Sequence, residues 1–458
     1  MAVVVVVFTR DLRVHDNPAL HAAATAADHV VPVFVVDDGI ARVGFNAPNR
    51  AAFLADCLAD LDRSIRERGG RLVVRRGDVV DEVVRLAEQV DAQAVHIARD
   101  YSRYAGTRER RLRDGLGRRP LVTYDSHVIA PPGEVVTTAG EAYSVFTPYH
   151  RTWVRHERRR VLPAPRSLRV PSRVAAGRLP RPDEICAGAR SPDLAAGGES
   201  VARARLAQWL RRGLSGYERS HDLLAEDGTS GLSAYLHFGC VSAVEVAARA
   251  EGHGAGAAAF ERQMCWRDFF HQVLAARPDV VDRDWRPRGD HWRRDDAAYR
   301  AWQDGRTGYP LVDAGMRQLA REGRMHNRAR LVTASFLTKH LYVDWRLGAA
   351  HFFDLLLDGD LANNTLNWQW VAGTGTDSRP NRMLNPARQL ARYDAGLDYV
   401  RRYVPEFGTG AYPGQIVDHG EAVAAFRAAR AVADRRTRGF APSPALGSVV
   451  AGPDGWIS

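Results

Sequence analysis

The sequence predicts a chain of two parts: an α/β domain with a doubly wound parallel sheet, followed by an all-α C-terminal domain. Over residues 1–130, short valine-rich runs alternate with longer amphipathic stretches, which is the pattern of parallel β-α-β units. Beyond residue 201 the strand signals cease, helical periodicity dominates, and most of the ten tryptophans follow. Between the two parts, residues 131–200 are rich in Pro, Gly, Arg and Ala and indicate an interdomain connector.

The elements of the first part follow from hydrophobic periodicity. Strands are expected at the valine-rich runs, and helices where apolar residues recur at helical spacing. The expected strands are 3–8, 31–36, 71–75, 94–97 and 121–124, and the expected helices are 49–68 and 79–89. No GxGxxG follows the first strand, so the ordinary dinucleotide fingerprint is absent. The helical domain is expected over 201–440, with a late helix at 421–435 and a polar tail at 441–458.

Composition excludes several classes of protein. With 45% hydrophobic and 26% charged residues, the 458-residue chain has the balance of a globular protein and not of a disordered or fibrous one. The four cysteines are scattered and form no CxxC pair, so we expect no disulfide framework and no metal site. The apolar start is too short and lacks the basic flank of a signal peptide, and no apolar run is long enough to span a membrane. We therefore expect a cytoplasmic monomer with no membrane partner.

The net charge of +10 is compatible with a polyanionic partner but does not require one. Residues 1–130 carry 19 arginines against 18 acidic residues, so the excess lies in the rest of the chain. The densest cluster comprises Arg151, Arg155, Arg158, Arg159 and Arg160. A solvated helix or linker face explains such a run more often than a nucleic-acid contact does.

Several segments of the helical part carry polar residues that ordinary helices do not need. The stretch 227–233 places hydroxyls and glycines before an apolar helix, which suits a pyrophosphate, but taken alone it is more often an ordinary helix cap. In 263–270, 325–330 and 358–370, charged or amide side chains stand beside large aromatic residues. Buried Arg and Asp are seldom unpaired, so Arg330 is expected to pair with Asp358 or Asp360 or to bind a polar cofactor edge.

These segments together resemble the DNA photolyase/cryptochrome family, and most of all its bacterial class I enzymes for cyclobutane pyrimidine dimers. The resemblance begins at 8–17 (FTRDLRVHDN) and continues through TGYP at 307–310, MHNR at 325–328, DGDLANN at 358–364, NWQW at 367–370 and GTGTD at 373–377. It covers residues 1 to about 405, and the motifs are highly specific when taken jointly.

The resemblance implies that the helical domain holds a noncovalent, folded FAD. The residues at matching positions are Tyr217, Thr229, Ser230, Gly231, Leu232, Ser233, Arg267, Arg330, Asp358, Gly359, Asp360 and Asn364. Asn364 falls where the family places a side chain facing flavin N5. An amide there can accept a hydrogen bond from a protonated N5 or donate one to a neutral N5.

The resemblance also implies light-driven repair of DNA. Excited reduced flavin gives an electron to a flipped-out cyclobutane dimer, the ring opens, and the electron returns. Residues matching DNA or lesion contacts are His221, Gln263, Trp266, Asn327, Arg328, Trp370 and Gln389. Trp368, Trp345 and Trp292 match a chain that passes electrons to oxidised flavin, and Gln263 and Asn364 are the other expected catalytic positions. Taken singly, a tryptophan such as Trp266 or Trp370 is more often a core residue than a wall of the lesion site, and ten tryptophans leave room for the three of the chain to be core residues.

Departures from the family pattern leave alternatives open. Gln263 replaces a usual Glu, Arg324 a Trp, His221 an Arg, and Leu331 a Met. Gln263 is also found in the (6-4) photolyase branch, but that branch has histidines at the positions of Asn327 and Leu331, so we expect cyclobutane-dimer repair. A cryptochrome-type blue-light sensor is the second hypothesis. A dark flavin reductase is the third, and it lacks a nicotinamide fingerprint.

The N-terminal part resembles the family's antenna domain, which can hold a second chromophore. Phe34, Asp37, Arg50, Phe53 and Asp100 are expected to line its crevice. Because Ala47-Pro48-Asn49-Arg50 looks more like the deazaflavin subgroup, 8-hydroxy-deazaflavin is preferred over methenyltetrahydrofolate.

Overall fold

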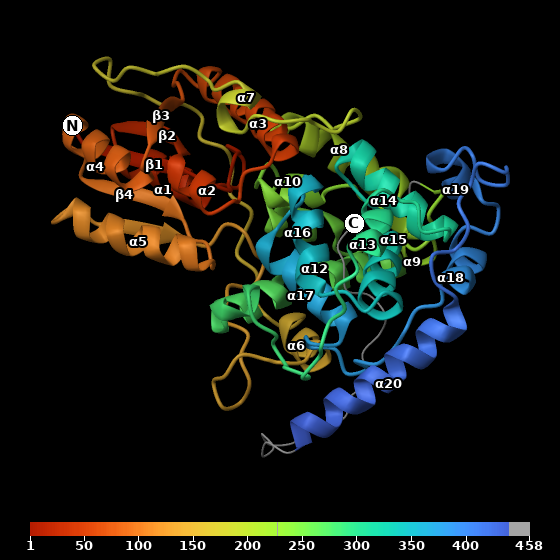
Figure 1. The fold of residues 1–458 in the computed structure, drawn as a ribbon. Coiled ribbons are helices and arrows are strands. Elements are labelled where there is room, and N and C mark those ends of the chain that lie inside the picture. The colour runs from red at the N-terminus through yellow and green to blue at the C-terminus, as the bar shows by residue number, and fades with distance from the viewer. Residues whose placement is uncertain (227, 439–458) are drawn as a thin grey trace. The chain divides into compact units, whose positions relative to one another are not determined.

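The computed structural model describes residues 1–226 and 228–438, so the tail expected at 441–458 lies outside the described residues. The chain divides into two compact units (Figure 1). The sheet unit comprises Met1–Pro131, Glu157–Leu214 and Ser230–His253, and the helical unit comprises Pro132–His156, Ser215–Thr229 and the chain from Gly254 onward. Each unit is described by itself below.

The sheet unit contains a five-stranded, fully parallel sheet in the order β3-β2-β1-β4-β5. Its strands are β1 Val3–Phe8, β2 His29–Asp37, β3 Val73–Gly77, β4 Ala94–Ala98 and β5 Leu121–Tyr124. Chain order reverses at β1, as in doubly wound sheets. The central strand is buried along its whole length, because helices cover both faces of a parallel sheet. The predicted doubly wound parallel sheet is confirmed.

The helices of the sheet unit include both helices expected from periodicity. They are α1 Pro18–Ala26, α2 Asp38–Arg42, α3 Pro48–Arg66, α4 Val79–Val90, α5 Arg103–Leu116, α7 Pro182–Ile185, α8 Glu199–Arg212, α10 Ser233–His237 and α11 Ala243–Ala250. The expected helix at 49–68 is α3, and the one at 79–89 is α4. Asp78 caps α4 by accepting hydrogen bonds from the amides of Val80 and Asp81.

Much of the expected connector packs with the sheet unit. The amide of Val74 on β3 donates to the carbonyl of Ala176 at 2.7 Å, and the amide of Leu168 donates to the carbonyl of Arg68 at 2.7 Å. The segment 157–200 therefore lies along the edge of the sheet. Residues 132–156, with α6 Phe146–Trp153, belong to the helical unit.

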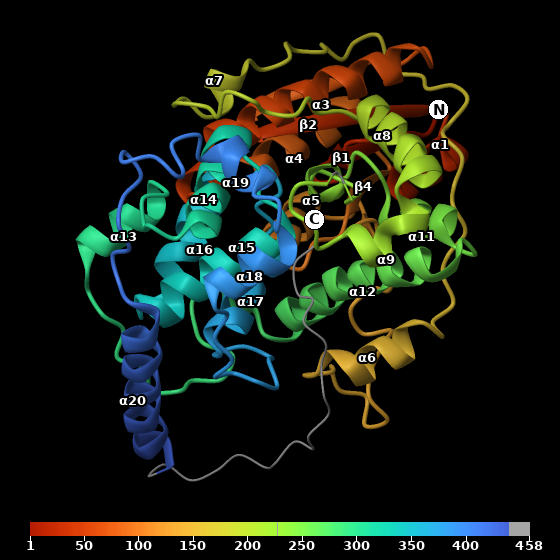
Figure 2. The same cartoon turned by 90° about the vertical axis from the view of Figure 1, so that its right-hand side faces the viewer.

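The helical unit contains no strand among its described residues, in agreement with the predicted all-α domain. Besides α6 it has α9 Tyr217–Ser220, α12 Gly254–Ala276, α13 Asp296–Gln303, α14 Pro310–Glu322, α15 Asn327–Ser335, α16 Trp345–Leu355, α17 Leu361–Ala372, α18 Pro386–Tyr393, α19 Asp398–Tyr403 and α20 His419–Arg438. Short 3-10 turns lie at Leu214–Gly216 and Pro278–Val281, and a π turn, η3, at Phe336–His340. Helix α17 packs against α12, α15 and α16 (Figure 2).

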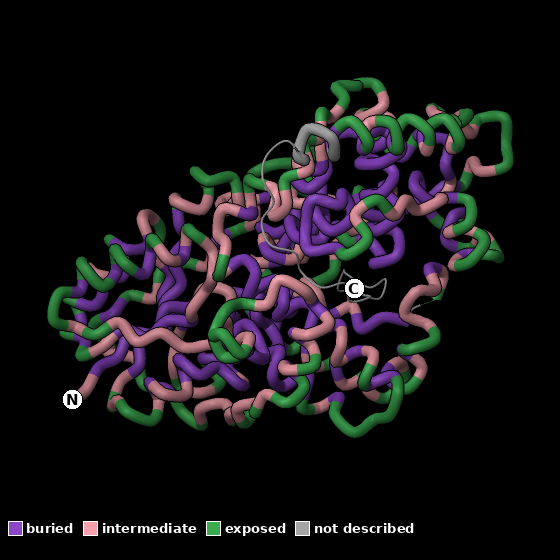
Figure 3. Tube along the Cα trace, turned by 90° about the horizontal axis from the view of Figure 1, so that it is seen from below, coloured by how far each residue is buried: buried purple, intermediate pink, exposed green. Residues whose placement is uncertain are grey.

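The core of the helical unit surrounds these packed helices. Helix α15 is buried at every position, whereas α18 and the described part of α20 have many exposed residues. Figure 3 colours the chain by burial and shows buried segments inside the protein and exposed ones mainly on outer helices and loops. A helix that is buried all round must satisfy its polar side chains inside the protein or with a ligand. In the part of the chain that the structure describes, no helix is long and apolar enough to cross a membrane.

Candidate cofactor and DNA site

The first polar group of the site joins α15 to the turn before α17. Arg330 Nη2 lies 3.0 and 2.8 Å from the two carboxylate oxygens of Asp358, and Arg330 Nε donates to the carbonyl of Met325 at 2.9 Å. Asp360 caps α17 by accepting from the amide of Asn363 at 2.8 Å. Arg330 and Asp360 are buried, so this ion pair and this cap place two carboxylates at the start of a buried helix.

Asn364, in the first turn of α17, carries an amide with a defined orientation. Its side-chain nitrogen donates to the carbonyl of Ala349 at 2.9 Å. The side-chain oxygen, Oδ1, is buried and has no hydrogen-bond partner among the described residues. A buried acceptor without a partner is costly, so this oxygen is suited to a ligand that donates a hydrogen bond.

Helix α12 carries the residues expected to face the lesion and the flavin. Gln263 is buried, and its Oε1 has no partner within the described chain. Trp266 is also buried, with its ring stacked on Phe146 at 3.6 Å between centroids, so one of its faces is already covered. Arg267 Nη1 lies 3.9 Å from Asp268 Oδ1.

Two residues of α12 that the sequence analysis missed belong to this polar group. Asp268 accepts a hydrogen bond from Trp153 Nε1 at 3.0 Å, and His271 Nε2 lies 3.8 Å from Asp360 Oδ2. His271 follows Arg267 by four residues, a spacing that could have indicated a shared helix face, whereas Asp268 has no such spacing from Gln263 or Arg267.

The start of α15 carries a second cluster, formed with the turn after α9. Arg328 pairs with Asp222, Nε to Oδ1 at 3.2 Å, and its guanidinium lies 4.4 Å from the centroid of the Tyr393 ring. Asn327 is buried, and its Oδ1 has no partner in the described structure. Burial lowers the pKa of the neighbouring His326 to about 3, so this side chain is neutral at physiological pH.

The expected contacts Tyr217 and His221 lie together on α9. Their rings stack at 5.0 Å between centroids, and His221 Nδ1 lies 2.8 Å from the carbonyl oxygen of Tyr217. His221 Nε2 is 3.9 Å from Asp222 Oδ1, so both residues adjoin the Arg328 pair.

Trp370 and Gln389 complete the lesion residues of the helical unit. Trp370 is 6% exposed, and the Arg382 guanidinium lies 5.9 Å from its ring centroid. Gln389 on α18 has a buried Oε1 without a partner among the described residues. A flat ring beside a cation suits a stacked base, and the Gln389 oxygen could accept a hydrogen bond from a ligand.

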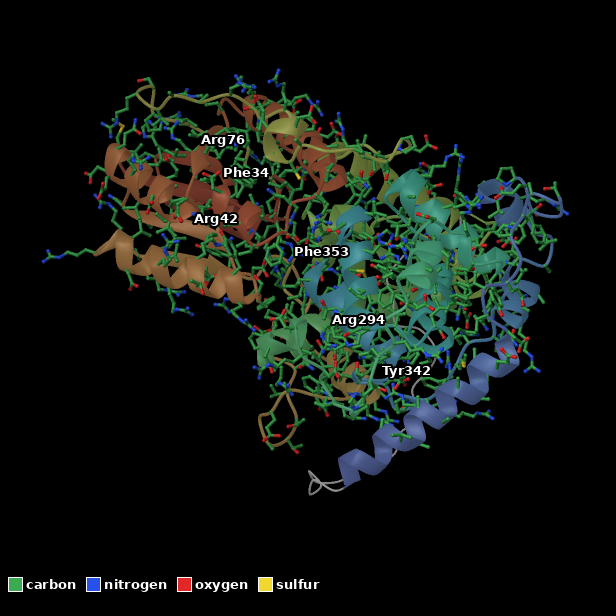
Figure 4. The ribbon with its side chains drawn as sticks, viewed as in Figure 1. Phe34, Arg42, Arg76, Arg294, Tyr342 and Phe353 are labelled. Atoms are coloured by element: carbon green, nitrogen blue, oxygen red, sulfur yellow. The ribbon has the colours of Figure 1, made fainter. Side chains whose placement is uncertain are left out.

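The three chain tryptophans differ in their surroundings. Trp368 is fully buried, and its ring contacts are with Trp302 at 6.0 Å and Phe352 at 4.9 Å. Trp345 donates through Nε1 to Asp284 Oδ1 at 2.9 Å. Trp292 lies 5.1 Å from Tyr342, which is labelled in Figure 4. Among the described residues, no ring contact of this kind joins Trp368 to Trp345.

The expected phosphate turn divides between the two units. Thr229 belongs to the helical unit, and Ser230, Gly231, Leu232 and Ser233 belong to the sheet unit. Gly231 has a positive φ of 60°. A Cβ there would stand 2.3 Å from Arg205 Nη1, so glycine allows the close approach of a cation that the sequence analysis missed.

The antenna candidates all lie in the sheet unit: Phe34 (labelled in Figure 4) and Asp37 at the carboxyl end of β2, Asp100 just after β4, and Arg50 and Phe53 on α3. Asp37 accepts from the hydroxyl of Tyr104, and Asp100 pairs with Arg10 at 3.4 Å. Burial raises the pKa of Asp100, but the cations Arg10, His127 and Arg108 outweigh it and hold this pKa below its ordinary value. Arg50 donates to the carbonyl of Phe45, and Phe53 packs against Tyr235 and Phe238.

Arg108 on α5 was not predicted as an antenna residue. It is buried, and its Nε and Nη2 have no hydrogen-bond partner in the described chain. Its place at the carboxyl ends of parallel strands is where ligands of doubly wound sheets bind.

One motif of the resemblance has a structural role. The buried carboxylate of Asp313 accepts from the amides of Thr307 and Gly308 and from the hydroxyls of Thr307 and Tyr412. These bonds hold the TGYP turn at the start of α14.

The polar side chains of the helical unit fit a polar, planar cofactor. Gln263, Asn327, Asn364 and Gln389 each present an oxygen without a protein partner, and they come from four helices. A buried oxygen without a protein partner is costly, so each of these four can accept a hydrogen bond from a ligand. A parallel-sheet unit joined to a helical unit of this kind defines a two-part, cofactor-binding protein with a helical active-site domain.

Comparisons with known proteins agree with this class. Residues 260–425 match the family described as "FAD binding domain of DNA photolyase", and residues 4–167 match "DNA photolyase". A relative from Streptomyces griseus named "Deoxyribodipyrimidine photo-lyase" is 55% identical, with 94% of this chain and 99% of the relative covered. A relative of the same name from Halobacterium salinarum is 38% identical, with 92% and 98% covered. The chain belongs to the DNA photolyase/cryptochrome family.

Solved structures show the same similarity. A class III photolyase from Agrobacterium tumefaciens superposes with a TM-score of 0.87 at 32% identity, covering 95% of this chain and 98% of the other. A Synechocystis cryptochrome gives a TM-score of 0.86 at 27% identity, covering 93% and 99%. Since both branches share the fold, activity must be argued from sites.

Proposed function

We infer that the protein is a light-driven DNA repair enzyme, a carbon–carbon lyase that splits cyclobutane pyrimidine dimers. The observation that carries this conclusion is the set of buried, unpartnered amide oxygens of Gln263, Asn327, Asn364 and Gln389, in a family whose relatives are named for this reaction. The sensor and (6-4) readings are less favoured.

FAD, when bound in its reduced form, would supply the light-excited electron that opens the dimer. Arg330, Asp358 and Asp360 would hold its polar edge, and Asn364 Oδ1 would accept a hydrogen bond from it. Because Ala349 holds the Asn364 nitrogen, the amide presents its oxygen, which favours a protonated N5 over a bare one.

We propose that the lesion residues act as a receptor for an extruded dimer of two adjacent pyrimidines. Trp370 would stack on one pyrimidine, while the carboxamides of Gln263 and Asn327 would bind the polar edges of the bases. Arg328 is buried and paired with Asp222, so it would hold the start of α15, and with it Asn327, in place and would not itself contact the DNA backbone. No bond of the protein is made or broken, so these residues bind and orient.

Two further roles are proposals. Trp368, Trp345 and Trp292 would return oxidised flavin to its reduced state. In the sheet unit, the buried Arg108 cation beside Asp100 suits a chromophore with an acidic ring hydroxyl, which favours 8-hydroxy-deazaflavin over methenyltetrahydrofolate. An Arg108→Met variant should lose the antenna absorption band, whereas Arg110→Met on the same helix should keep it. A cytoplasmic location and a monomeric state remain predictions from the sequence.

The repair activity is tested with the reduced holoprotein. An oligonucleotide carrying one thymine cyclobutane dimer is illuminated with it, and intact thymines are measured by chromatography. A matched oligonucleotide with a (6-4) product and a dark sample serve as controls. We expect light-dependent recovery of the first substrate alone. No recovery after confirmed flavin reduction, with no preference for damaged DNA in the dark, would instead support the sensor.

A further inference from the structure

A fourth tryptophan, Trp302, lies against the buried Trp368. Trp302 is on α13, is fully buried, and donates through Nε1 to the carbonyl of Thr333 at 3.0 Å. The centroids of the two indole rings are 6.0 Å apart, with an interplanar angle of 75°. This is an edge-to-face contact, within the range of directly packed aromatic rings.

Two further aromatic rings lie nearly parallel to the Trp302 indole, and each could in principle extend the contact with Trp368. Phe352 lies 6.0 Å away at 9°, and Tyr299 lies 5.9 Å away at 16°. A phenyl ring is too hard to oxidise to pass an electron, so Phe352 cannot act as an electron donor to Trp302. A phenol is oxidised readily when its proton can leave, so Tyr299 can act as an electron donor to Trp302.

Tyr299 extends this contact to the surface of the helical unit. It precedes Trp302 by three residues on α13, the spacing that places side chains over one another on a helix. Its ring is half-buried, and its hydroxyl donates to the carbonyl of Leu347 at 3.0 Å, beside a side chain that is 48% exposed. The phenolic proton can therefore pass to water.

We propose that Trp302 and Tyr299 form a second route that supplies electrons to Trp368, parallel to the route through Trp345 and Trp292. The proposal rests on the proposed function, in which Trp368, Trp345 and Trp292 would return oxidised flavin to its reduced state. If Trp368 gave one electron to the bound, light-excited flavin, Trp302 would give one electron to Trp368, and Tyr299 would then give one electron to Trp302. Tyr299 releases its phenolic proton to water and becomes a neutral radical, so one electron and one proton leave the tyrosine.

The charges around Tyr299 support this end of the route. Burial raises the pKa of the Tyr299 phenol, and the nearby carboxylate of Asp354 raises it further, so the resting side chain is protonated. The same carboxylate stabilises the positive charge that develops as the ring loses an electron.

The test is flash photolysis of the oxidised holoprotein, with electron paramagnetic resonance to identify the radicals. Ring-deuterated tyrosine, incorporated during expression, should narrow the tyrosyl signal and leave tryptophanyl signals unchanged. We expect wild-type protein to form a tyrosyl radical after the flash. Trp345→Phe, which blocks the parallel route, should increase the tyrosyl share of the total radical yield.

The variants of the route itself have matched controls. Tyr299→Phe and Trp302→Phe should each lose the tyrosyl signal. Tyr143→Phe removes a half-buried tyrosine whose hydroxyl bonds to Thr152, and Trp209→Phe removes a buried tryptophan of the sheet unit; both should keep the signal. Tyr299→Phe loses only one surface hydroxyl, so it remains informative if Trp302→Phe fails to fold.

Three results would overturn the proposal: no tyrosyl radical in wild-type or Trp345→Phe protein, a tyrosyl radical that persists in Tyr299→Phe, or one that persists in folded Trp302→Phe. Repair by chemically reduced wild-type protein is measured separately. Since chemical reduction bypasses the aromatic route, failure of that assay contradicts the proposed function and not the route.

Discussion

Gly348 on α16 lies directly beneath the ring of Trp368 on α17. A Cβ added to Gly348 would stand 2.3 Å from Cη2 of the indole. The indole is itself fully buried and cannot move aside freely. The small residue thus sets the distance between the two helices at the centre of the aromatic cluster.

Gly348→Ala should therefore destabilise the protein, although alanine is the better helix former. Overpacking of a core costs about 1 to 3 kcal/mol, which exceeds the gain of about 1 kcal/mol in helix propensity. Denaturant unfolding measures the difference. Gly106→Ala on α5 is the matched control, because nothing lies within 4 Å of its added Cβ, and it should stabilise. Equal stability changes in both variants would contradict the packing argument.

In the Asn364→Leu variant, bound FAD should have a weaker preference for the forms in which N5 is protonated. The change removes the unpartnered Oδ1 while keeping a buried side chain of similar size. Loss of one hydrogen bond of about 1 kcal/mol corresponds to about a fivefold change in the equilibrium. A spectroscopic redox titration of the flavin measures it. Gln369→Leu removes a buried amide on the same helix whose oxygen already accepts from the amide of Trp285, so it should alter stability but not the titration.

Gln263→Leu should weaken dark binding of dimer-bearing DNA by about fivefold, the equivalent of one hydrogen bond of about 1 kcal/mol. Undamaged DNA should bind as before, because the buried Oε1 meets only an extruded base. Fluorescence anisotropy with the two oligonucleotides separates these cases. A parallel loss for both would show that the variant disturbs the general DNA surface.

Lys339, the sole lysine of the chain, should give the protein a stability that rises with pH. Burial lowers its folded pKa to about 7 from an ordinary value of 10.5, despite the attraction of Asp377. Between these values the unfolded chain binds the extra proton and the folded one does not, so stability increases from pH 7 toward 10.5. Unfolding at pH 7, 8 and 9 should show this slope.

A second measurement tests whether Lys339 causes the increase of stability with pH. Protein labelled with nitrogen-15 in lysine gives one side-chain resonance, and it should titrate near pH 7. Lys339→Met should lose the slope and also the hydrogen bond to the carbonyl of Pro380 at 3.1 Å. An unchanged slope in Lys339→Met would assign it to other groups.

The sheet was predictable because each of its strands contains a short run rich in valine or other apolar residues. Residues 3–8 and 121–124 match β1 and β5 as expected, while the strand expected at 71–75 begins and ends two residues later, at Val73–Gly77. Arginines follow the valines of β3, so composition does not mark its end. Helix α5 is rich in arginine and gives little apolar periodicity, and it was not expected.

Site residues could be predicted from the sequence only where they belong to, or adjoin, a recognisable motif. Arg330 and Asp358 adjoin recognisable segments, and the structure brings them together as expected. Arg205, Arg108 and Trp302 lie in segments whose composition is that of ordinary helices. Their proximity to the site residues depends on tertiary packing, which no local pattern encodes.

The hydrogen bond between Val74 and Ala176 bears on how strongly this protein resists aggregation at high protein concentration. β3 is an outer strand of the sheet, and a bare outer strand offers free amides and carbonyls to any other extended chain. The segment around Ala176 occupies that position, and the positive φ of Gly177 lets it approach, since a Cβ there would stand 2.3 Å from the carbonyl oxygen of Val74. The segment around Ala176, which composition assigns to the interdomain connector, thus covers part of the outer strand and reduces its pairing with strands of other molecules.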